Sequence, residues 1–380
     1  MGMGMSWHDA LATLQEFVHT IVNARVTNRK LFSAWCRSHE AEMEQFFGYE
    51  RKDKMPSIAS LVTASFHPAA PLIMLNYTGA AHNLLHAYPD GWTWGVRHCR
   101  GIVFDTDGVL VAHPFSKFFN YGEHPETQRN ALRGSFTATQ KYDGHLGIIF
   151  RYKGKLYITT RGDFESPTAK MAQCMLDRYA AQHDWLSKIG EGFTLLVEII
   201  HPSTEVFVDY DGREEFVLLT FRRNGENCFF PHVYTRGLGE QLGLSVTEQW
   251  CGDSVGELIA LMRDRLVSNK EGYVAYFGAQ KIHVKFKFMT YINKMVEKKL
   301  GYKYLMQRMI AGNLNKMIGN LPEEILERAR RMCARLRKIA RDKTRNEKEK
   351  RQMLYALVPE EESTSYYRAV CRNFLKASIT

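Results

Sequence analysis

The hydrophobic pattern of this 380-residue chain changes its period twice, and this change constrains the fold more than any other feature. Apolar residues recur at helical spacing in residues 7–25 and alternate with a period of two in short runs between residues 101 and 288. Helical spacing returns after Tyr291. Strands broken by isolated helices are typical of α+β domains with mainly antiparallel sheets. We therefore predict such a domain in residues 1–292 and a small all-helical domain in residues 293–380.

The expected strands are short apolar runs that turn residues separate. They cover residues 102–104, 109–112, 146–152, 156–160, 193–200, 206–210, 216–221, 273–277 and 282–288. Lys153-Gly154 is a hairpin signal between two of them. Residues 167–179 and 253–266 are the expected helices in this part of the chain.

Positive charge is concentrated at the end of the chain. Residues 291–380 contain 21 Lys and Arg against 10 Asp and Glu, whereas the remaining residues contain 30 against 31. A helix expected to begin at Asn320 places its apolar residues on one stripe and many arginines around it; the stripe is Ile325, Ala329, Met332, Leu336 and Ile339. This distribution predicts a basic domain that meets a polyanion, and the alternative is a solvated helical surface.

The composition narrows the class of protein. Hydrophobic residues make up 45% of the chain and charged residues 24%, as in ordinary globular proteins. The sequence contains no apolar run of membrane-spanning length and begins without a signal-peptide pattern. Seven cysteines without a Cys-x-x-Cys pair indicate a reducing compartment. We therefore expect a soluble, cytoplasmic protein with no membrane attachment, although Gly2 and Ser6 formally fit a myristoylation pattern.

Residue types suited to nucleotide chemistry follow one another along the strand-rich region. A Lys-x-Asp-Gly segment alone is usually a turn, and paired lysines on a strand are often a solvated face. A glutamate inside an apolar run is costly unless it is paired or binds a ligand. Together these residues are hard to explain by packing; they are Lys141, Asp143 and Gly144, then Arg161, Glu198, Glu271, Lys285 and Lys287.

This constellation resembles the nucleotidyltransferase motifs of polynucleotide ligases and mRNA capping enzymes. Further residues resemble the T4 RNA ligase 1-like family; they are Tyr77, Arg100, Lys117, Phe119 and Tyr291. The resemblance implies a nucleotidyltransferase fold of the ligase/capping type in the first domain. Among the departures from the pattern, Arg161 stands where the family has lysine and cannot serve in proton transfer.

The resemblance also implies the role of each residue. Lys141 would be the nucleophile that takes AMP from ATP; its amine attacks phosphorus only when neutral, which the nearby cations Lys285 and Lys287 favour. Lys285 and Lys287 would also neutralise phosphate charge. Glu198 would accept a hydrogen bond from ribose, and Glu271 would bind Mg²⁺, with Mn²⁺ as an alternative.

The remaining candidates form the expected nucleotide-binding surface. Arg100 and Lys117 would contact the triphosphate, and Gly144 would allow close approach of the backbone. Tyr77 and Phe119 are either nucleotide-pocket aromatics or core residues. Arg161 would contact ATP, and Asp143 and Tyr291 are further essential candidates.

These expectations identify the chain as an ATP-dependent RNA ligase. Its partners would be RNA 5′-phosphate and 3′-hydroxyl ends, with a nicked tRNA as one candidate, and it would act as a monomer. The alternatives are a GTP-dependent capping enzyme, a DNA ligase, or an RNA-binding protein without catalysis. The first two are disfavoured because no strand pattern of an OB-fold follows Tyr291.

Overall fold

The computed structural model describes residues 7–52, 54–85, 88–204, 206–264, 266–318, 323–358 and 364–377. It divides into two compact units, Met1–Phe288 and Met289–Thr380. The boundary lies four residues before the expected division at 292/293. Among the described residues, no helix has both the length and the apolar character needed to cross a membrane.

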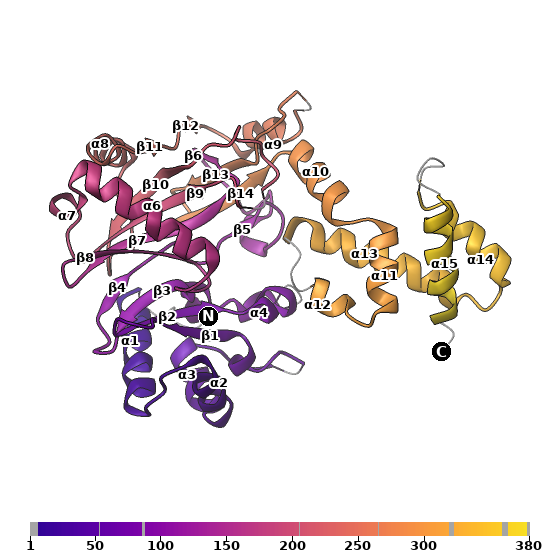
Figure 1. Cartoon of the computed structure of the whole chain (residues 1–380), viewed down its shortest axis with the longest axis horizontal. Helices are drawn as coiled ribbons and strands as arrows, with labels where there is room; N and C mark the ends of the chain where they lie inside the picture. Colours follow the sequence, from indigo (N-terminus) through magenta and orange to yellow (C-terminus); the bar gives the residue numbers. More distant parts are fainter. Residues whose placement is uncertain are drawn as a thin grey trace. The chain divides into compact units, whose positions relative to one another are not determined.

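The first sheet of the first unit carries the N-terminal helices on one face. Its antiparallel strands follow the order β1 (Val62–Phe66), β2 (Leu72–Tyr77), β3 (Arg100–Asp105) and β4 (Leu110–Ala112). The helices are α1 (Trp7–Asn23), α2 (Arg29–Ser38), α3 (Glu40–Phe47), α4 (Gly79–Leu84) and α5 (Trp94–His98). Phe17, Phe47 and Ile102 belong to the core that these helices share with the sheet (Figure 1).

The second sheet lies between the first sheet and a separate layer of helices. Its order is β11 (Ser245–Val246), β10 (Glu215–Arg223), β9 (Phe193–Ile200), β7 (His145–Tyr152) and β8 (Lys155–Thr160). Leu195 and Phe216 pack in one core with residues of α6 (Pro167–His183), α7 (Trp185–Lys188) and α8 (His232–Leu242). Leu196 and Phe150 point to the other face and share a core with Val103 of β3.

The third sheet has one apolar face and one partly exposed polar face. Its order is β12 (Gln249–Gly252), β6 (Phe136–Lys141), β13 (Gly272–Phe277), β14 (Ile282–Lys287) and β5 (Phe119–Asn120). Ala138, Ala275 and Phe286 form the apolar face, and Leu258 of α9 (Val255–Met262) belongs to the same core. Because side chains alternate along a strand, Lys141 and Lys285 lie on the opposite face.

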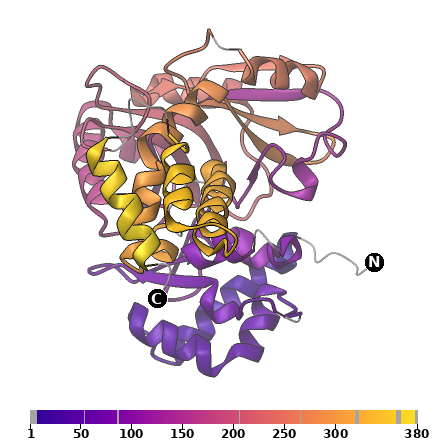
Figure 2. The same ribbon diagram turned by 90° about the vertical axis from the view of Figure 1, so that its right-hand side faces the viewer.

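The second unit is helical throughout its described residues. It consists of α10 (Met289–Lys299), α11 (Tyr302–Ile310), α12 (Leu314–Ile318), α13 (Glu323–Arg341), α14 (Glu347–Tyr355) and α15 (Ser365–Ala377), which pack alongside one another (Figure 2). The expected apolar stripe of α13 is buried at four positions, whereas Met332 is half-buried and Cys333 is buried beside it. The expected helix start at Asn320 lies outside the described residues.

The predicted fold class is confirmed, since the sheets are mainly antiparallel and flanked by helices. Only the pairs β10–β11 and β14–β5 are parallel among the described strands. One expected strand, residues 206–210, is wrong. The backbone N–H groups of Phe207 and Val208 donate to the Asp143 carboxylate, so they form no strand ladder. The sequence pattern does not predict the strands β1, β2, β5, β6, β11 and β12.

Candidate active site

Three adjacent strands bring the candidate nucleophile next to a second lysine. Lys141 at the end of β6 lies opposite Gly272 of β13, and Gly272 lies opposite Lys287 of β14. A Cβ atom on Gly272 would lie 2.0 Å from the Phe286 carbonyl oxygen, so only glycine permits this close strand pairing. The register therefore places the two lysines on either side of a residue that has no side chain.

Glu271 joins these two lysines through both of its carboxylate oxygens. Lys141 Nζ donates to Glu271 Oε2 at 2.7 Å, and Lys287 Nζ lies 2.8 Å from Oε1. The Glu271 side chain is 3% exposed, against 21% for Lys141 and 10% for Lys287. Two cations thus share one buried anion, and this arrangement holds the Lys141 amine at the polar face of the third sheet.

Glu198 faces the segment that follows the candidate nucleophile. The Gly144 backbone N–H donates to Glu198 Oε1 at 3.0 Å. Burial raises the pKa of the Glu198 carboxyl to about 7, although the neighbouring Lys141 ammonium acts to lower it. A Cβ atom on Gly144 would lie 2.4 Å from the Ile199 carbonyl oxygen. Gly144 is therefore required for the close packing of this turn against β9.

Asp143 anchors the segment that follows β9. Its Oδ2 atom accepts hydrogen bonds from the N–H groups of Phe207 at 2.6 Å and Val208 at 3.0 Å. The Asp143 N–H in turn donates to the Tyr210 hydroxyl at 2.7 Å. The sequence analysis does not predict a role for Tyr210 at the site. It places Tyr210 at the end of an expected strand, and no motif contains this residue.

Tyr77 and Arg161 meet although they lie 84 positions apart. An Arg161 guanidinium nitrogen donates to the Tyr77 hydroxyl, and the guanidinium carbon lies 4.6 Å from the centre of the tyrosine ring. Tyr77 is buried, and its ring packs edge-on against Trp92. The arginine that replaces the family lysine therefore uses its planar head to hold this tyrosine.

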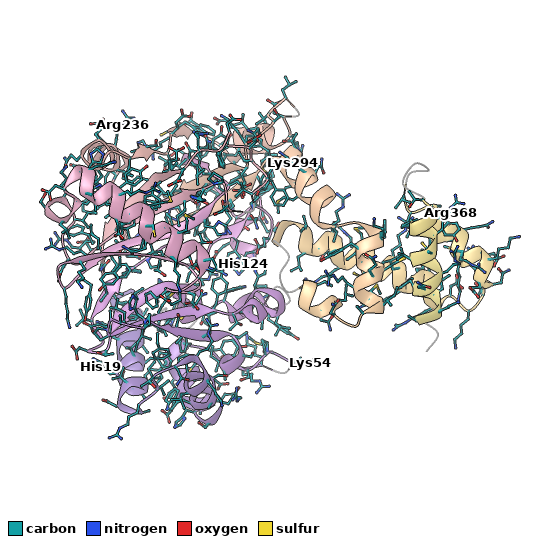
Figure 3. The ribbon with its side chains drawn as sticks, viewed as in Figure 1. His19, Lys54, His124, Arg236, Lys294 and Arg368 are labelled. Carbon is teal, nitrogen blue, oxygen red and sulfur yellow. The ribbon has the colours of Figure 1, made fainter. Side chains whose placement is uncertain are left out.

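Phe119 and Lys117 lie deeper than their expected roles suggest. Phe119 is 1% exposed and stacks on His124, which is labelled in Figure 3, with ring centres 4.2 Å apart. Lys117 is also buried; its Nζ lies 4.7 Å from the centre of the Phe119 ring and 3.7 Å from Glu123. Phe119 is therefore a core residue in this structure. Its contact with a nucleotide stays a prediction.

Lys285 and Arg100 approach the same aromatic ring. Lys285 Nζ lies 5.0 Å from the centre of the Phe118 ring, and the Arg100 guanidinium carbon lies 5.6 Å from it. Lys285 shares a strand face with Lys287, so these cations extend the row of positive charge that begins beside Lys141. Tyr291 is buried on α10 in the second unit, and its role stays a prediction.

The described side chains of the site offer few ligands to a divalent cation. No group of three or more His, Cys, Asp and Glu side chains that could hold a metal ion occurs in the part of the chain that the structure describes. Mg²⁺ commonly binds through one or two carboxylates together with substrate phosphates and water. Glu271 fits this mode, because its carboxylate faces the two lysines that would meet a phosphate.

Comparisons with known proteins identify the family. The sequence model of a family described as RNA ligase matches residues 98–296, which is more than half of the chain. The chain belongs to this RNA ligase family, and the expected T4 RNA ligase 1-like membership is confirmed. The matched residues include all the candidate site residues named above except Tyr77, which lies upstream of position 98.

Relatives with similar sequences align with only part of this chain. A Thermovibrio ammonificans protein, named as a candidate RNA ligase, is 31% identical over 186 residues, covering 47% of each chain. RNA ligase 1 of bacteriophage TS2126 is 30% identical over 207 residues, covering 51% of this chain and 50% of the phage protein. The chain thus spans about half the length of these relatives. An archaeal ATP-dependent RNA ligase structure aligns with a TM-score of 0.45 at 17% identity, covering 74% of this chain and 77% of that one.

Proposed function

We propose that the chain is an ATP-dependent RNA ligase that acts through a covalent AMP on Lys141. The observation that carries this proposal is the bridge from Lys141 through Glu271 to Lys287. In this bridge the Lys141 amine and the Lys287 cation each lie within hydrogen-bond distance of the buried Glu271 carboxylate. Membership of the RNA ligase family supports the assignment.

The first step forms a phosphoramide bond. The neutral Lys141 Nζ attacks the α-phosphorus of ATP, the bond from that phosphorus to the bridging oxygen breaks, and pyrophosphate leaves with the bonding electrons. Glu271 accepts a hydrogen bond from Nζ, so it is positioned to take the proton that the amine must lose. Lys287 would then neutralise charge on the α-phosphate as the transition state forms.

Other residues of the site bind the nucleotide in this proposal. Lys285 and Arg100 would contact the outgoing phosphates, and Glu198 would accept a hydrogen bond from ribose. A Mg²⁺ ion, or Mn²⁺ in its place, would be held by Glu271 and phosphate oxygens and would supply positive charge. Asp143 and Tyr210 would fix the turn that carries Gly144.

The later steps concern RNA. AMP would pass from Lys141 to a 5′-phosphate, and an RNA 3′-hydroxyl would displace AMP and seal the strand. The basic second unit would contact the RNA backbone, because phosphate contacts supply most sequence-independent affinity. A nicked tRNA is one candidate for a structured substrate, and the ligase would act as a monomer.

The test is transfer of label from α-labelled ATP to the protein. The wild type should be labelled by ATP and not by GTP, and the label should be released by 5′-phosphorylated RNA but not by 5′-hydroxyl RNA. Lys141→Ala should abolish labelling, and Lys141→Arg should do the same, because guanidinium stays protonated. A folded Lys141→Ala variant that still carries AMP would overturn the assignment of the nucleophile.

A further inference from the structure

Residues 207–210, between β9 and β10, are anchored to the turn that follows the candidate nucleophile. Phe207 and Val208 donate their backbone N–H groups to the Asp143 carboxylate. The Asp143 N–H donates in return to the Tyr210 hydroxyl. Phe207, Val208 and Tyr210 are all buried. Three of the four residues in this segment therefore hold it against the turn.

Asp209, the remaining residue of the segment, is exposed and is bound by a side chain from another loop. Its N–H donates to Asn269 Oδ1 at 2.6 Å, and its carbonyl oxygen accepts a hydrogen bond from Asn269 Nδ2 at 2.7 Å. An N–H only donates and a carbonyl oxygen only accepts, so the two partners fix the orientation of the amide. Asn269 thus pairs with both backbone groups of one residue, as a residue of a neighbouring antiparallel strand does.

Asn269 lies in the loop that leads into β13, two residues before Glu271. Its φ angle is +56°, a left-handed conformation that asparagine adopts more readily than most residues. Asn269 is exposed, so packing in the core does not account for its side chain. The two bonds to Asp209 are therefore the contribution of this side chain to the loop.

These contacts complete a closed ring of covalent and hydrogen-bonded links around the candidate nucleophile. One part runs from Lys141 along the chain to Asp143 and through residues 207–209 to Asn269. The other part runs from Asn269 along the chain to Glu271, which accepts the hydrogen bond from Lys141 Nζ at 2.7 Å. Each link in the ring limits where the Glu271 carboxylate lies relative to the Lys141 amine.

We propose that Asn269 is a positioning residue for the transfer of AMP to Lys141. The proposal rests on the proposed function, in which Glu271 takes the proton that the Lys141 amine loses. Asn269 ties the backbone before Glu271 to residues 207–210 and so keeps the carboxylate within hydrogen-bond distance of the amine. A displacement of a reacting group by about 1 Å can cost about a hundredfold in rate, so a tether on this loop affects the reaction.

The main test variant is Asn269→Gly. Glycine adopts the left-handed conformation without strain, so this change keeps the backbone and removes both bonds to Asp209. Lys281→Gly is the matched control, because Lys281 is also exposed and left-handed, with a φ angle of +55°, in the turn between β13 and β14. Both changes add similar freedom to the unfolded chain. Asn269→Asp keeps an acceptor for the Asp209 N–H and tests for partial rescue.

The first measurement is single-turnover labelling of the whole chain with α-labelled ATP. Asn269→Gly should lower the labelling rate at saturating ATP at least fivefold. The ATP concentration that gives half of the maximal rate should change less than twofold, because the nucleotide contacts are kept. Asn269→Asp should lie between the wild type and Asn269→Gly, and Lys281→Gly should match the wild type. A merely structural role would lower the labelled fraction and the melting temperature and leave the labelling rate of the folded protein unchanged.

The second measurement is hydrogen exchange without ATP. The Glu271 carbonyl oxygen accepts the Phe288 N–H at 2.9 Å, so the Phe288 amide reports the position of the Glu271 backbone. In Asn269→Gly, exchange should accelerate at least threefold at Asp209, whose N–H loses its acceptor, and at Phe288. Lys281→Gly should leave exchange at both amides as in the wild type.

The two measurements together decide the proposal. Slower labelling with faster exchange at Phe288 supports a positioning role. An unchanged labelling rate in folded Asn269→Gly would overturn it, and so would slower labelling with unchanged exchange at Phe288. Failure of the proposed function would appear separately, as absence of AMP labelling in the wild type. Exchange at Phe288 then decides alone whether Asn269 positions Glu271, and an unchanged exchange rate rejects that role.

Discussion

At the scale of single residues, the carboxylates of the site have distinct environments. Glu271 is neutralised by two lysines through direct ion pairs, whereas Glu198 accepts a hydrogen bond from a backbone N–H and is otherwise governed by burial. One carboxylate oxygen of Asp143 accepts hydrogen bonds from two backbone N–H groups. Three acidic residues that look alike in the sequence thus have three different environments in the fold: Glu271 pairs with the lysines, the buried Glu198 accepts the Gly144 N–H, and Asp143 anchors a loop.

Glu198 should make stability depend on pH. The pKa of its carboxyl is about 7 in the folded protein, against an ordinary value of 4.5. The stability that this group contributes is therefore complete below about pH 4.5 and is lost as the pH rises through about 7. Glu198→Gln removes this dependence. Between pH 4.5 and 8 the wild type should lose on the order of 3 kcal/mol relative to the variant. Denaturant unfolding at several pH values measures this difference, and a constant difference would contradict it.

Asp143 should control the order of the segment after β9. Asp143→Ala removes the acceptor of the Phe207 and Val208 N–H groups, each bond to a charged group contributing about 1.5–3 kcal/mol. Hydrogen exchange at these two amides should accelerate at least tenfold, while exchange in β9 stays as in the wild type. Equal protection at residues 207 and 208 in both proteins would mean that the carboxylate does not hold this segment.

At the scale of elements, the pairing of β13 with β14 determines the spacing of the site. The residue between the two lysines has to be glycine, because the β14 backbone occupies the place of a side chain. The outer face of the same strands is apolar and covered by α9. The strands are therefore fixed on one face by packing, and they present the lysines on the other.

Gly272→Ala should damage both the fold and the site. The added methyl group would meet the Phe286 carbonyl oxygen, so β14 must shift, at a cost of about 1–3 kcal/mol or more. The shift moves Lys287, and AMP labelling should fall by at least tenfold in the folded fraction. Gly278→Ala is the control, since its Cβ would lie 4.0 Å from its nearest neighbour, a ring carbon of Tyr276. Equal labelling of the two variants would argue against the register as the determinant of the site.

At the scale of the whole molecule, charge is divided between the two units. The residues from Tyr291 onward hold the entire positive excess of the chain, whereas the site motifs lie before them. On α13 the exposed arginines alternate with the buried stripe, so charge can be changed there without touching the core. The exposed face of α15 adds Arg368 (Figure 3), which lies over the Tyr355 ring.

Charge reversal on α13 should weaken RNA binding and leave AMP labelling intact. Arg331→Glu with Arg335→Glu should reduce RNA affinity about tenfold or more and lower the slope of log K against log salt by about two, one per lost phosphate contact. The control makes the same change in the first unit, with Lys155→Glu and Arg236→Glu, both exposed. Fluorescence titration at several salt concentrations measures both quantities. Identical slopes for the two double variants would mean that α13 is only a solvated surface.

Local residue patterns are enough to predict part of the fold. The period-two runs predicted β7, β8, β9, β13 and β14, and the helical spacing predicted α1, α6 and the buried stripe of α13. The order of Lys141, Glu198, Glu271, Lys285 and Lys287 along the chain predicted the family. These features follow from residue type and spacing alone, because they depend on neighbours within one strand, one helix or one motif.

The contacts among the candidate site residues depend on the tertiary structure. No local sequence pattern indicates that Glu271 bridges both lysines. The bridge depends on the register of β6 with β13 and β14, and β6 lies more than a hundred positions before them in the chain. The false strand at residues 206–210 arose because apolar alternation does not reveal a carboxylate that captures its N–H groups. The burial of Phe119 is likewise not visible in any local pattern. It results from the packing of segments that are distant in the sequence.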